Sequence, residues 1–258
     1  MFDSGFGGLT VARAVIDLYP GADVAYFGDT ARYPYGPRPF DEVRGYAVQV
    51  AGWMVDRFDP AVLVVACNTA TAVALDELRS TLPIPVVGVL EPGLRSLLAV
   101  TGSDRVGVIG TVGTVASGAY QQLANKIAPE VALTCTACPG FVEFVERGDT
   151  ESEQVHVLAR RLLAPMVEAK VDALLLGCTH YPFLARTIAD VMGPDVVLVS
   201  SADETAFALA DSVTDETAAG AGRHTFVSSG DVETFARLGR ELLGPELVEV
   251  VGHEWGEE

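Results

Sequence analysis

Lysine is scarce in this chain of 258 residues, and a strongly basic segment is missing. Lys126 and Lys170 stand beside fifteen arginines, and 35 acidic residues against 17 basic ones give a formal net charge of −18. Proteins that bind nucleic acid gather positive charge against the phosphates, and anionic membrane surfaces attract basic segments. The composition therefore argues against both as partners.

Long apolar runs and a dense set of cysteines are also missing. The apolar runs, such as residues 61–67, have the length of a strand and fall short of the roughly 20 residues of a membrane-spanning helix. No basic stretch followed by an apolar run marks a secretory signal. The four cysteines are too few for a disulfide scaffold in a chain of this length. We expect a cytoplasmic protein whose cysteines serve catalysis, metal binding or the core.

Hydrophobic residues make up 49% of the chain, which is ordinary for a globular protein. Short β-branched runs alternate with amphipathic helical patterns, and this alternation predicts a doubly wound α/β fold with parallel strands. The expected strands cover residues 24–27, 61–67, 86–89, 106–109, 131–135, 173–176 and 196–199. The expected helices cover residues 40–57, 70–79, 115–127, 154–169, 183–191 and 205–213.

Two strand–turn–helix units recur in the same order in the two halves of the chain. They are FDSGFGGLTVARAV (2–15) and VLVVACNTATAVAL (62–75), then VGVIGTVGTVASGAY (106–120) and DALLLGCTHYPFLA (172–185). Asp3 precedes Cys67 by 64 residues, and Thr111 precedes Cys178 by 67. One half is therefore expected to be a diverged copy of the other, with chance similarity among such units as the alternative.

Cys67 and Cys178 each follow a predicted strand and precede a helix. Ligands of α/β sheets bind at this end of the strands. A helix N-terminus stabilises a thiolate, so we expect a lowered thiol pKa there. The following residues can bind an anion such as a carboxylate, and they are Asn68, Thr69, Thr179 and His180. Two small thiols buried in the core are the alternative.

Two such thiols, on opposite sides of a cleft, suit a symmetrical proton exchange. One thiolate removes a proton from one face of a carbon and the other thiol delivers one to the opposite face, which inverts the α-carbon of an amino acid. Pyridoxal phosphate would need a lysine at the site. Lys126 lies in a helical pattern and Lys170 precedes a strand at its amino end, so any racemisation is expected to proceed without a cofactor.

The other two cysteines, Cys135 and Cys138, form a C-x-x-C pair. A second pair and a nearby histidine are missing, so we expect no metal site. A thioredoxin-like redox function stays open, although Pro139 and Gly140 equally indicate a turn. Buried structural thiols are the favoured interpretation.

Seven strings in the chain follow the order of a known family. They are FDSGFGGLTVARA, YFGDTARYPYG, VVACNTATA, VVGVLEPG, GVIGTVGTVASGAY, CPGFVEFVERG and LLLGCTHYPFL. Through them the chain resembles the glutamate racemases, within the aspartate/glutamate racemase superfamily. The strings run from residue 2 to about residue 205, and the last 50 or so residues match weakly.

The resemblance implies two similar α/β domains with pseudo-two-fold symmetry and the active site in the cleft between them. The domains would comprise residues 1–91 with 204–258, and residues 92–203. It further implies cofactor-independent interconversion of L- and D-glutamate, which supplies D-glutamate for peptidoglycan, and a homodimer.

The resemblance also implies roles for individual residues. Cys67 and Cys178 match the two catalytic bases, with Cys67 acting on D-glutamate and Cys178 on L-glutamate. Asp3, Glu146 and His180 match residues that assist the thiols or position the substrate ammonium. The positions that match substrate contacts are Asp3, Ser4, Tyr35, Gly36, Asn68, Thr69, Thr111, Thr114, Thr179 and His180.

Alternatives to these assignments stay open. The substrate could be aspartate or another acidic amino acid, or the protein could bind such a molecule without catalysis. Taken alone, Asp3 could begin a turn, His180 could begin a helix and Glu146 could be a solvated helix residue. The family also has a full strand before the DSG motif, whereas this chain begins Met1-Phe2-Asp3. The sequence could be truncated at this end. If it is complete, a central strand is cut short, and a free α-amino group beside Asp3 could disturb the site and cost stability.

Overall fold

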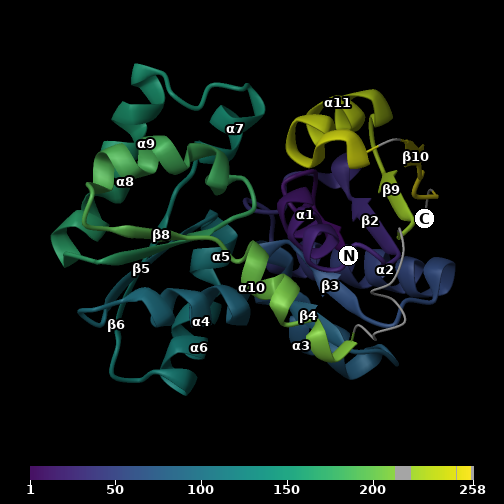
Figure 1. The fold of residues 1–258 in the computed structure, drawn as a ribbon, viewed down its shortest axis with the longest axis horizontal. Coiled ribbons are helices and arrows are strands. Elements are labelled where there is room, and N and C mark those ends of the chain that lie inside the picture. The colour runs from purple at the N-terminus through teal and green to yellow at the C-terminus, as the bar shows by residue number, and fades with distance from the viewer. Residues whose placement is uncertain (213–221, 248, 257–258) are drawn as a thin grey trace. The chain divides into compact units, whose positions relative to one another are not determined.

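The computed structural model describes residues 1–212, 222–247 and 249–256. The chain forms two compact units, Met1–Val89 with Ala202–Glu258, and Leu90–Ser201 (Figure 1). The domain boundaries expected from the sequence differ from these by two residues. Both units consist of parallel strands and helices, so the predicted α/β class is confirmed.

The first unit is built on six parallel strands in the order β10-β9-β2-β1-β3-β4. Their bounds are β1 Phe2–Asp3, β2 Val24–Gly28, β3 Leu63–Val65, β4 Val86–Gly88, β9 His224–Ser228 and β10 Val250–Gly252. The helices are α1 Leu9–Leu18, α2 Phe40–Phe58, α3 Asn68–Thr81, α10 Ala202–Phe207 and α11 Val232–Leu243, with 3-10 turns at Thr30–Arg32, Ala210–Ser212 and Gly244–Glu246. Helix α2 packs on α3, whereas α1 packs on α10 and α11. This grouping is that of a doubly wound sheet.

The second unit is built on four parallel strands in the order β6-β5-β7-β8. Their bounds are β5 Arg105–Gly110, β6 Ala132–Ala137, β7 Ala173–Gly177 and β8 Val197–Val199. The helices are α4 Leu90–Val100, α5 Val112–Ala116, α6 Ala119–Ile127, α7 Phe141–Glu146, α8 Glu153–Ala169 and α9 Ala185–Met192, with a 3-10 turn at Tyr181–Leu184. Helix α8 packs on α9, and α4 packs on α6.

The strand orders confirm the internal repeat. Within each sheet the first four strands of the unit lie in the order second, first, third, fourth, as β2-β1-β3-β4 and as β6-β5-β7-β8. Asp3 ends the first strand of its unit, and Thr111 follows the first strand of the other. Cys67 and Cys178 each follow the third strand. Strands β9 and β10 extend only the first sheet, beside β2.

All seven strands expected from the sequence are confirmed, but three helices differ from the prediction. The helix expected at 115–127 is two helices, because Gly118 between α5 and α6 has a φ of 69° that interrupts a right-handed helix. The helix expected at 183–191 begins with a 3-10 turn containing Pro182. The helix expected at 205–213 ends at Phe207, and residue 213 lies outside the described residues.

Helix α2 shows why the other helices could be predicted. Its residues Val43, Ala47, Val50 and Met54 recur every three or four positions, and all four are buried in the core of the first unit, as expected. The exposed face carries most of the charged residues of the helix. Burial of this apolar stripe therefore places α2 on the sheet.

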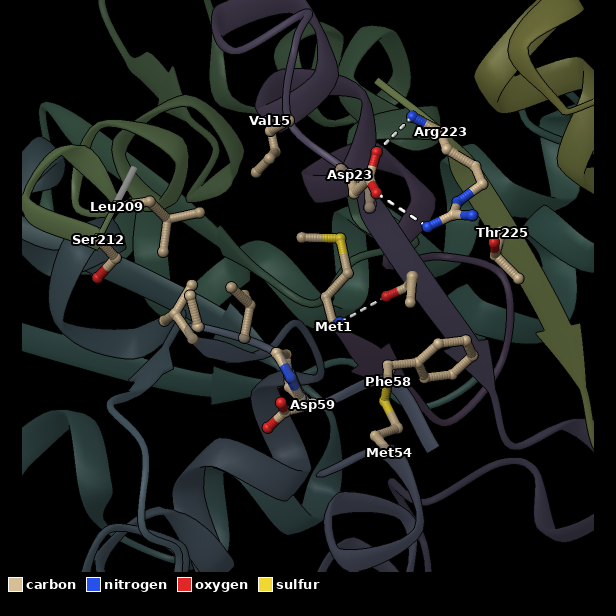
Figure 2. Close-up of a pocket in the computed structure, with 17 residues that line it drawn as sticks. Met1, Val15, Asp23, Met54, Phe58, Asp59, Leu209, Ser212, Arg223 and Thr225 are labelled. Carbon is tan, nitrogen blue, oxygen red and sulfur yellow. Dashed lines mark hydrogen bonds and ion pairs between the residues drawn. The ribbon is translucent and has the colours of Figure 1, made fainter. Parts of the chain in front are cut away.

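Strand β1 lies in the centre of its sheet but has only two residues. Phe2 pairs with Phe27 and Val65, and the Met1 amino group is buried and donates to the Ala25 carbonyl at 2.7 Å (Figure 2). Burial lowers the pKa of this amino group to about 5. A cavity of about 380 Å³ opens beside it, lined mainly by apolar side chains such as Met54.

No helix in residues 1–212, 222–247 and 249–256 combines the length and hydropathy that a membrane crossing requires.

Candidate active site

Cys67 stands at the junction of β3 and α3. It is the N-cap of α3, and its sulfur accepts a hydrogen bond from the Ala70 N–H at 3.5 Å. The sulfur also lies 4.0 Å from Ser4 Oγ, which comes from the turn after β1. Cys67 thus lies at the ligand end of the sheet. It is only 5% exposed and therefore has little contact with solvent.

The pKa of Cys67 differs from the sequence prediction. Burial, and after it the negative charge of Asp3, raise it to about 12, although hydrogen bonds from Ala70 and Ser4 act to lower it. The helix N-terminus thus acts in the expected direction, but desolvation is larger. The expectation of a lowered pKa was wrong for this thiol, and at neutral pH the substrate-free protein carries it protonated.

Asp3 is completely buried at the carboxyl end of β1. Its Oδ1 accepts the Gly5 N–H at 2.8 Å, which closes a turn toward α1. A Cβ at Gly8 would lie 2.6 Å from the Asp3 Cβ, so glycine is required for this close approach. The turn-forming interpretation of Asp3 therefore describes its local structure, while its charge still acts on Cys67.

The other predicted residues of this unit differ in how they are held. Ser4, Asn68 and Thr69 are buried in the turns next to Asp3 and Cys67. Tyr35 is completely buried, and its hydroxyl donates to the carboxylate of Asp29. Gly36 follows it and is also buried. The phenol of Tyr35 is thus engaged within the protein.

The sequence analysis did not identify Asp29 as a functional residue. It follows β2 at the ligand end of the sheet, which is the available signal, and it lies within the YFGDTARYPYG string. Its backbone N–H donates to the Asp3 carbonyl at 3.0 Å.

Cys178 follows β7 in the second unit and is 7% exposed. Its sulfur lies 3.9 Å from Nδ1 of His180. Burial lowers the pKa of His180 to about 4, so its imidazole is uncharged at neutral pH. The ring nitrogen that carries no proton in a neutral imidazole can accept a hydrogen bond from the thiol. Thr179, between the two, is also buried.

Thr111 and Thr114 lie at the end of β5, the strand next to β7. Thr111 caps α5: its Oγ1 accepts the Thr114 N–H at 3.1 Å and donates to Thr114 Oγ1 at 3.0 Å. Glu146 ends α7 and is half-buried, so it is not a fully solvated helix residue.

Cys135 and Cys138 are free thiols, and burial raises the pKa of each to about 12. The Cys138 carbonyl accepts the Tyr181 hydroxyl at 3.1 Å, and its N–H donates to Gly110. Redox-active dithiols have an accessible sulfur with a lowered pKa. The structure therefore favours structural thiols. In the part of the chain that is described, no three His, Cys, Asp or Glu side chains cluster as a metal site would require.

Comparison with known proteins gives a consistent result. The sequence profile of the Asp/Glu/hydantoin racemase family matches residues 10–209. A glutamate racemase of Geobacter metallireducens is 48% identical over 256 residues, covering 97% of this chain and 94% of that protein.

Two solved structures extend the similarity to the fold. The glutamate racemase isoform RacE1 from Bacillus anthracis is 36% identical with a TM-score of 0.90, covering 99% of this chain and 96% of that one. The glutamate racemase from Francisella tularensis, in complex with D-glutamate, is 29% identical with a TM-score of 0.87 and the same coverage. The chain therefore belongs to the Asp/Glu/hydantoin racemase family and, within it, to the glutamate racemases.

Proposed function

We propose that the protein interconverts L- and D-glutamate by proton transfer at the α-carbon, with Cys67 and Cys178 as the two proton carriers. The observation that carries this proposal is the equivalent place of the two thiols, each after the third strand of a sheet with the same strand order. The reaction supplies D-glutamate for peptidoglycan. Neither Lys126 in α6 nor Lys170 before β7 stands at a ligand end.

The proposed reaction breaks one C–H bond and forms another. With D-glutamate, the Cys67 thiolate takes the α-proton, and the electron pair of that bond remains on the α-carbon and delocalises into the adjacent carboxylate. The Cys178 thiol then protonates the opposite face of the carbon. L-glutamate follows the same steps with the two thiols exchanged.

The charge around Cys67 indicates how its thiolate forms. Asp3 raises the pKa of this thiol, so a positive charge placed near Asp3 would lower it. The ammonium group of the substrate supplies such a charge. Substrate binding would therefore generate the base, and the thiol would remain protonated without substrate.

His180 serves Cys178 in a different way. Its uncharged imidazole, with Nδ1 3.9 Å from the sulfur, can accept a hydrogen bond from that thiol. Glu146, also in the second unit, is assigned as a group that positions the substrate ammonium. The substrate carboxylates would be bound by side-chain and backbone groups of the remaining assigned positions. These are Ser4, Tyr35, Gly36, Asn68, Thr69, Thr111, Thr114 and Thr179. We further expect a homodimer located in the cytoplasm.

Circular dichroism of L-glutamate, and separately of D-glutamate, tests the function. With purified protein, reductant and no pyridoxal phosphate, both signals should decay to zero, because the two enantiomers have equal free energy. The same assay with aspartate tests the other substrate. Decay with aspartate alone would contradict the assigned substrate, and no decay with either would favour a protein that only binds acidic amino acids.

A further inference from the structure

Asp29 is a completely buried carboxylate whose two oxygens accept four hydrogen bonds. Oδ1 accepts from Ser229 Oγ at 2.7 Å and from Trp255 Nε1 at 3.0 Å. Oδ2 accepts from Arg32 Nε at 2.7 Å and from the Tyr35 hydroxyl. Buried charges of this kind are costly unless every lone pair finds a donor, which is the case here.

The four donors come from three segments that are far apart in sequence. Arg32 and Tyr35 belong to the segment after β2, Ser229 follows β9, and Trp255 lies after β10 near the end of the chain. Asp29 therefore joins the part of the first sheet that the family motifs cover to the part that carries none of them.

The C-terminal contact is reinforced around the same carboxylate. The Arg32 guanidinium lies 4.3 Å from the centroid of the Trp255 ring and 4.3 Å from that of Tyr46. Tyr46 in turn packs against Tyr35 at 5.7 Å between centroids. Stacking of this kind restricts the rotamers of Arg32, so its bond to Asp29 is well defined.

Through the Tyr35 hydroxyl, Asp29 is also linked to Tyr35 and Gly36, two residues assigned to substrate binding. The Tyr35 hydroxyl is engaged with Asp29 and its ring is buried, while Gly36 has no side chain. The Tyr35 carbonyl accepts the Arg38 N–H at 3.1 Å, so the backbone N–H groups are what these two positions can offer a substrate. The Asp29 backbone N–H also donates a hydrogen bond to the carbonyl of Asp3. Asp29 therefore contacts both Asp3 and Tyr35, two residues assigned to substrate binding.

We propose that Asp29 is a positioning residue for substrate binding: it holds the Tyr35–Gly36 backbone in place through the Tyr35 hydroxyl, and Trp255 fixes Asp29 in turn. This inference rests on the proposed racemase function. It predicts that loss of Asp29 weakens substrate binding more than it slows the chemical step, because the four donors that its carboxylate binds all belong to the protein and none is a thiol.

The first test is Asp29→Asn, which keeps the shape of the side chain. Its amide N–H₂ group is a donor and cannot accept the hydrogen bonds that one carboxylate oxygen of Asp29 accepts. We expect KM for glutamate to rise about tenfold with a smaller change in kcat. Trp255→Phe removes one donor and keeps an aromatic ring, so KM should rise in the same direction by less. The matched control is Asp23→Asn, which breaks an exposed ion pair with Arg223 before the start of β2 and should leave both constants unchanged.

A double-variant cycle separates positioning from a general loss of stability. If Asp29 acts through the Tyr35 hydroxyl, Asp29→Asn combined with Tyr35→Phe should raise KM little more than the larger single change. KM within about twofold of the unmodified protein in Asp29→Asn would overturn the proposal. Additive effects of the two changes on KM would also overturn the proposal. If Asp29→Asn does not fold, an unchanged KM in both Tyr35→Phe and Trp255→Phe would overturn it. An inactive unmodified protein would instead contradict the racemase function.

Discussion

Cys67 and Cys178 occupy equivalent places in their sheets, yet their neighbours differ. Cys67 has the carboxylate of Asp3, which raises its pKa, and Cys178 has the uncharged imidazole of His180 at 3.9 Å. The fold is thus repeated in the two units, while the chemistry around each thiol is not. A racemase needs equal overall efficiency in both directions, because its equilibrium constant is one, but it does not need identical helpers.

The largest expected effect comes from removing either thiol. Cys67→Ser and Cys178→Ser should each lower racemisation by about 10³-fold or more, because a hydroxyl is far less acidic than a thiol and one face then has no proton carrier. Polarimetry of both enantiomers measures this loss. Near-normal activity in either variant would remove the two-thiol mechanism.

Asp3→Asn tests the helper of the first thiol alone. We expect a loss of about 100-fold in kcat/KM, since the proposed partner of the substrate ammonium is removed. In the substrate-free protein, however, iodoacetamide should alkylate Cys67 faster than in the unmodified protein, because the charge that raises its pKa is gone. Slower alkylation would contradict this account of Asp3. Alkylation of Cys178 serves as the internal control and should change little.

The pH dependence of alkylation sharpens the comparison further. With a pKa of about 12, the fraction of Cys67 present as thiolate should increase about tenfold per pH unit between about pH 7 and 10. The rate of its alkylation should rise in proportion, without a plateau. Peptide mapping by mass spectrometry follows Cys67 separately from Cys178. A plateau near pH 8 would show that the helix N-terminus outweighs burial.

The smallest effect is expected at the second cysteine pair. Replacing Cys135 and Cys138 together by Ala should change kcat/KM by less than about threefold. The free energy of unfolding should fall by about 1–3 kcal/mol, because the buried Cys138 side chain leaves space in the core and the half-buried Cys135 adds less. Loss of activity in a protein that still folds would restore the redox interpretation.

The elements that the sequence predicted have regular patterns, although the amphipathic helices α4 and α11 were not predicted. Buried strands such as β5 are continuous apolar runs, and α2 shows a clear period of three to four residues. Strand β10 escaped prediction because three residues carry no measurable period. Strand β9 escaped because only part of it is buried, and because its place in the sheet depends on pairing with β2, about 200 residues away.

The candidate site shows the same limit. The thiols could be found because they recur at equivalent places in a repeated pattern. Asp29 could not, because its importance comes from donors at Ser229 and Trp255, which only the fold brings to it. The sign of the pKa shift of Cys67 was also beyond the sequence, since burial and the charge of Asp3 depend on three-dimensional packing.

Exchange of the α-proton in D₂O, followed by NMR in the two single-thiol variants, tests the central claim most directly. A variant with one thiol can still remove a proton and return a deuteron on the same face, so Cys178→Ser should exchange D-glutamate only and Cys67→Ser should exchange L-glutamate only, each without inversion. Exchange of both enantiomers by one variant would contradict the assignment of one thiol to each face.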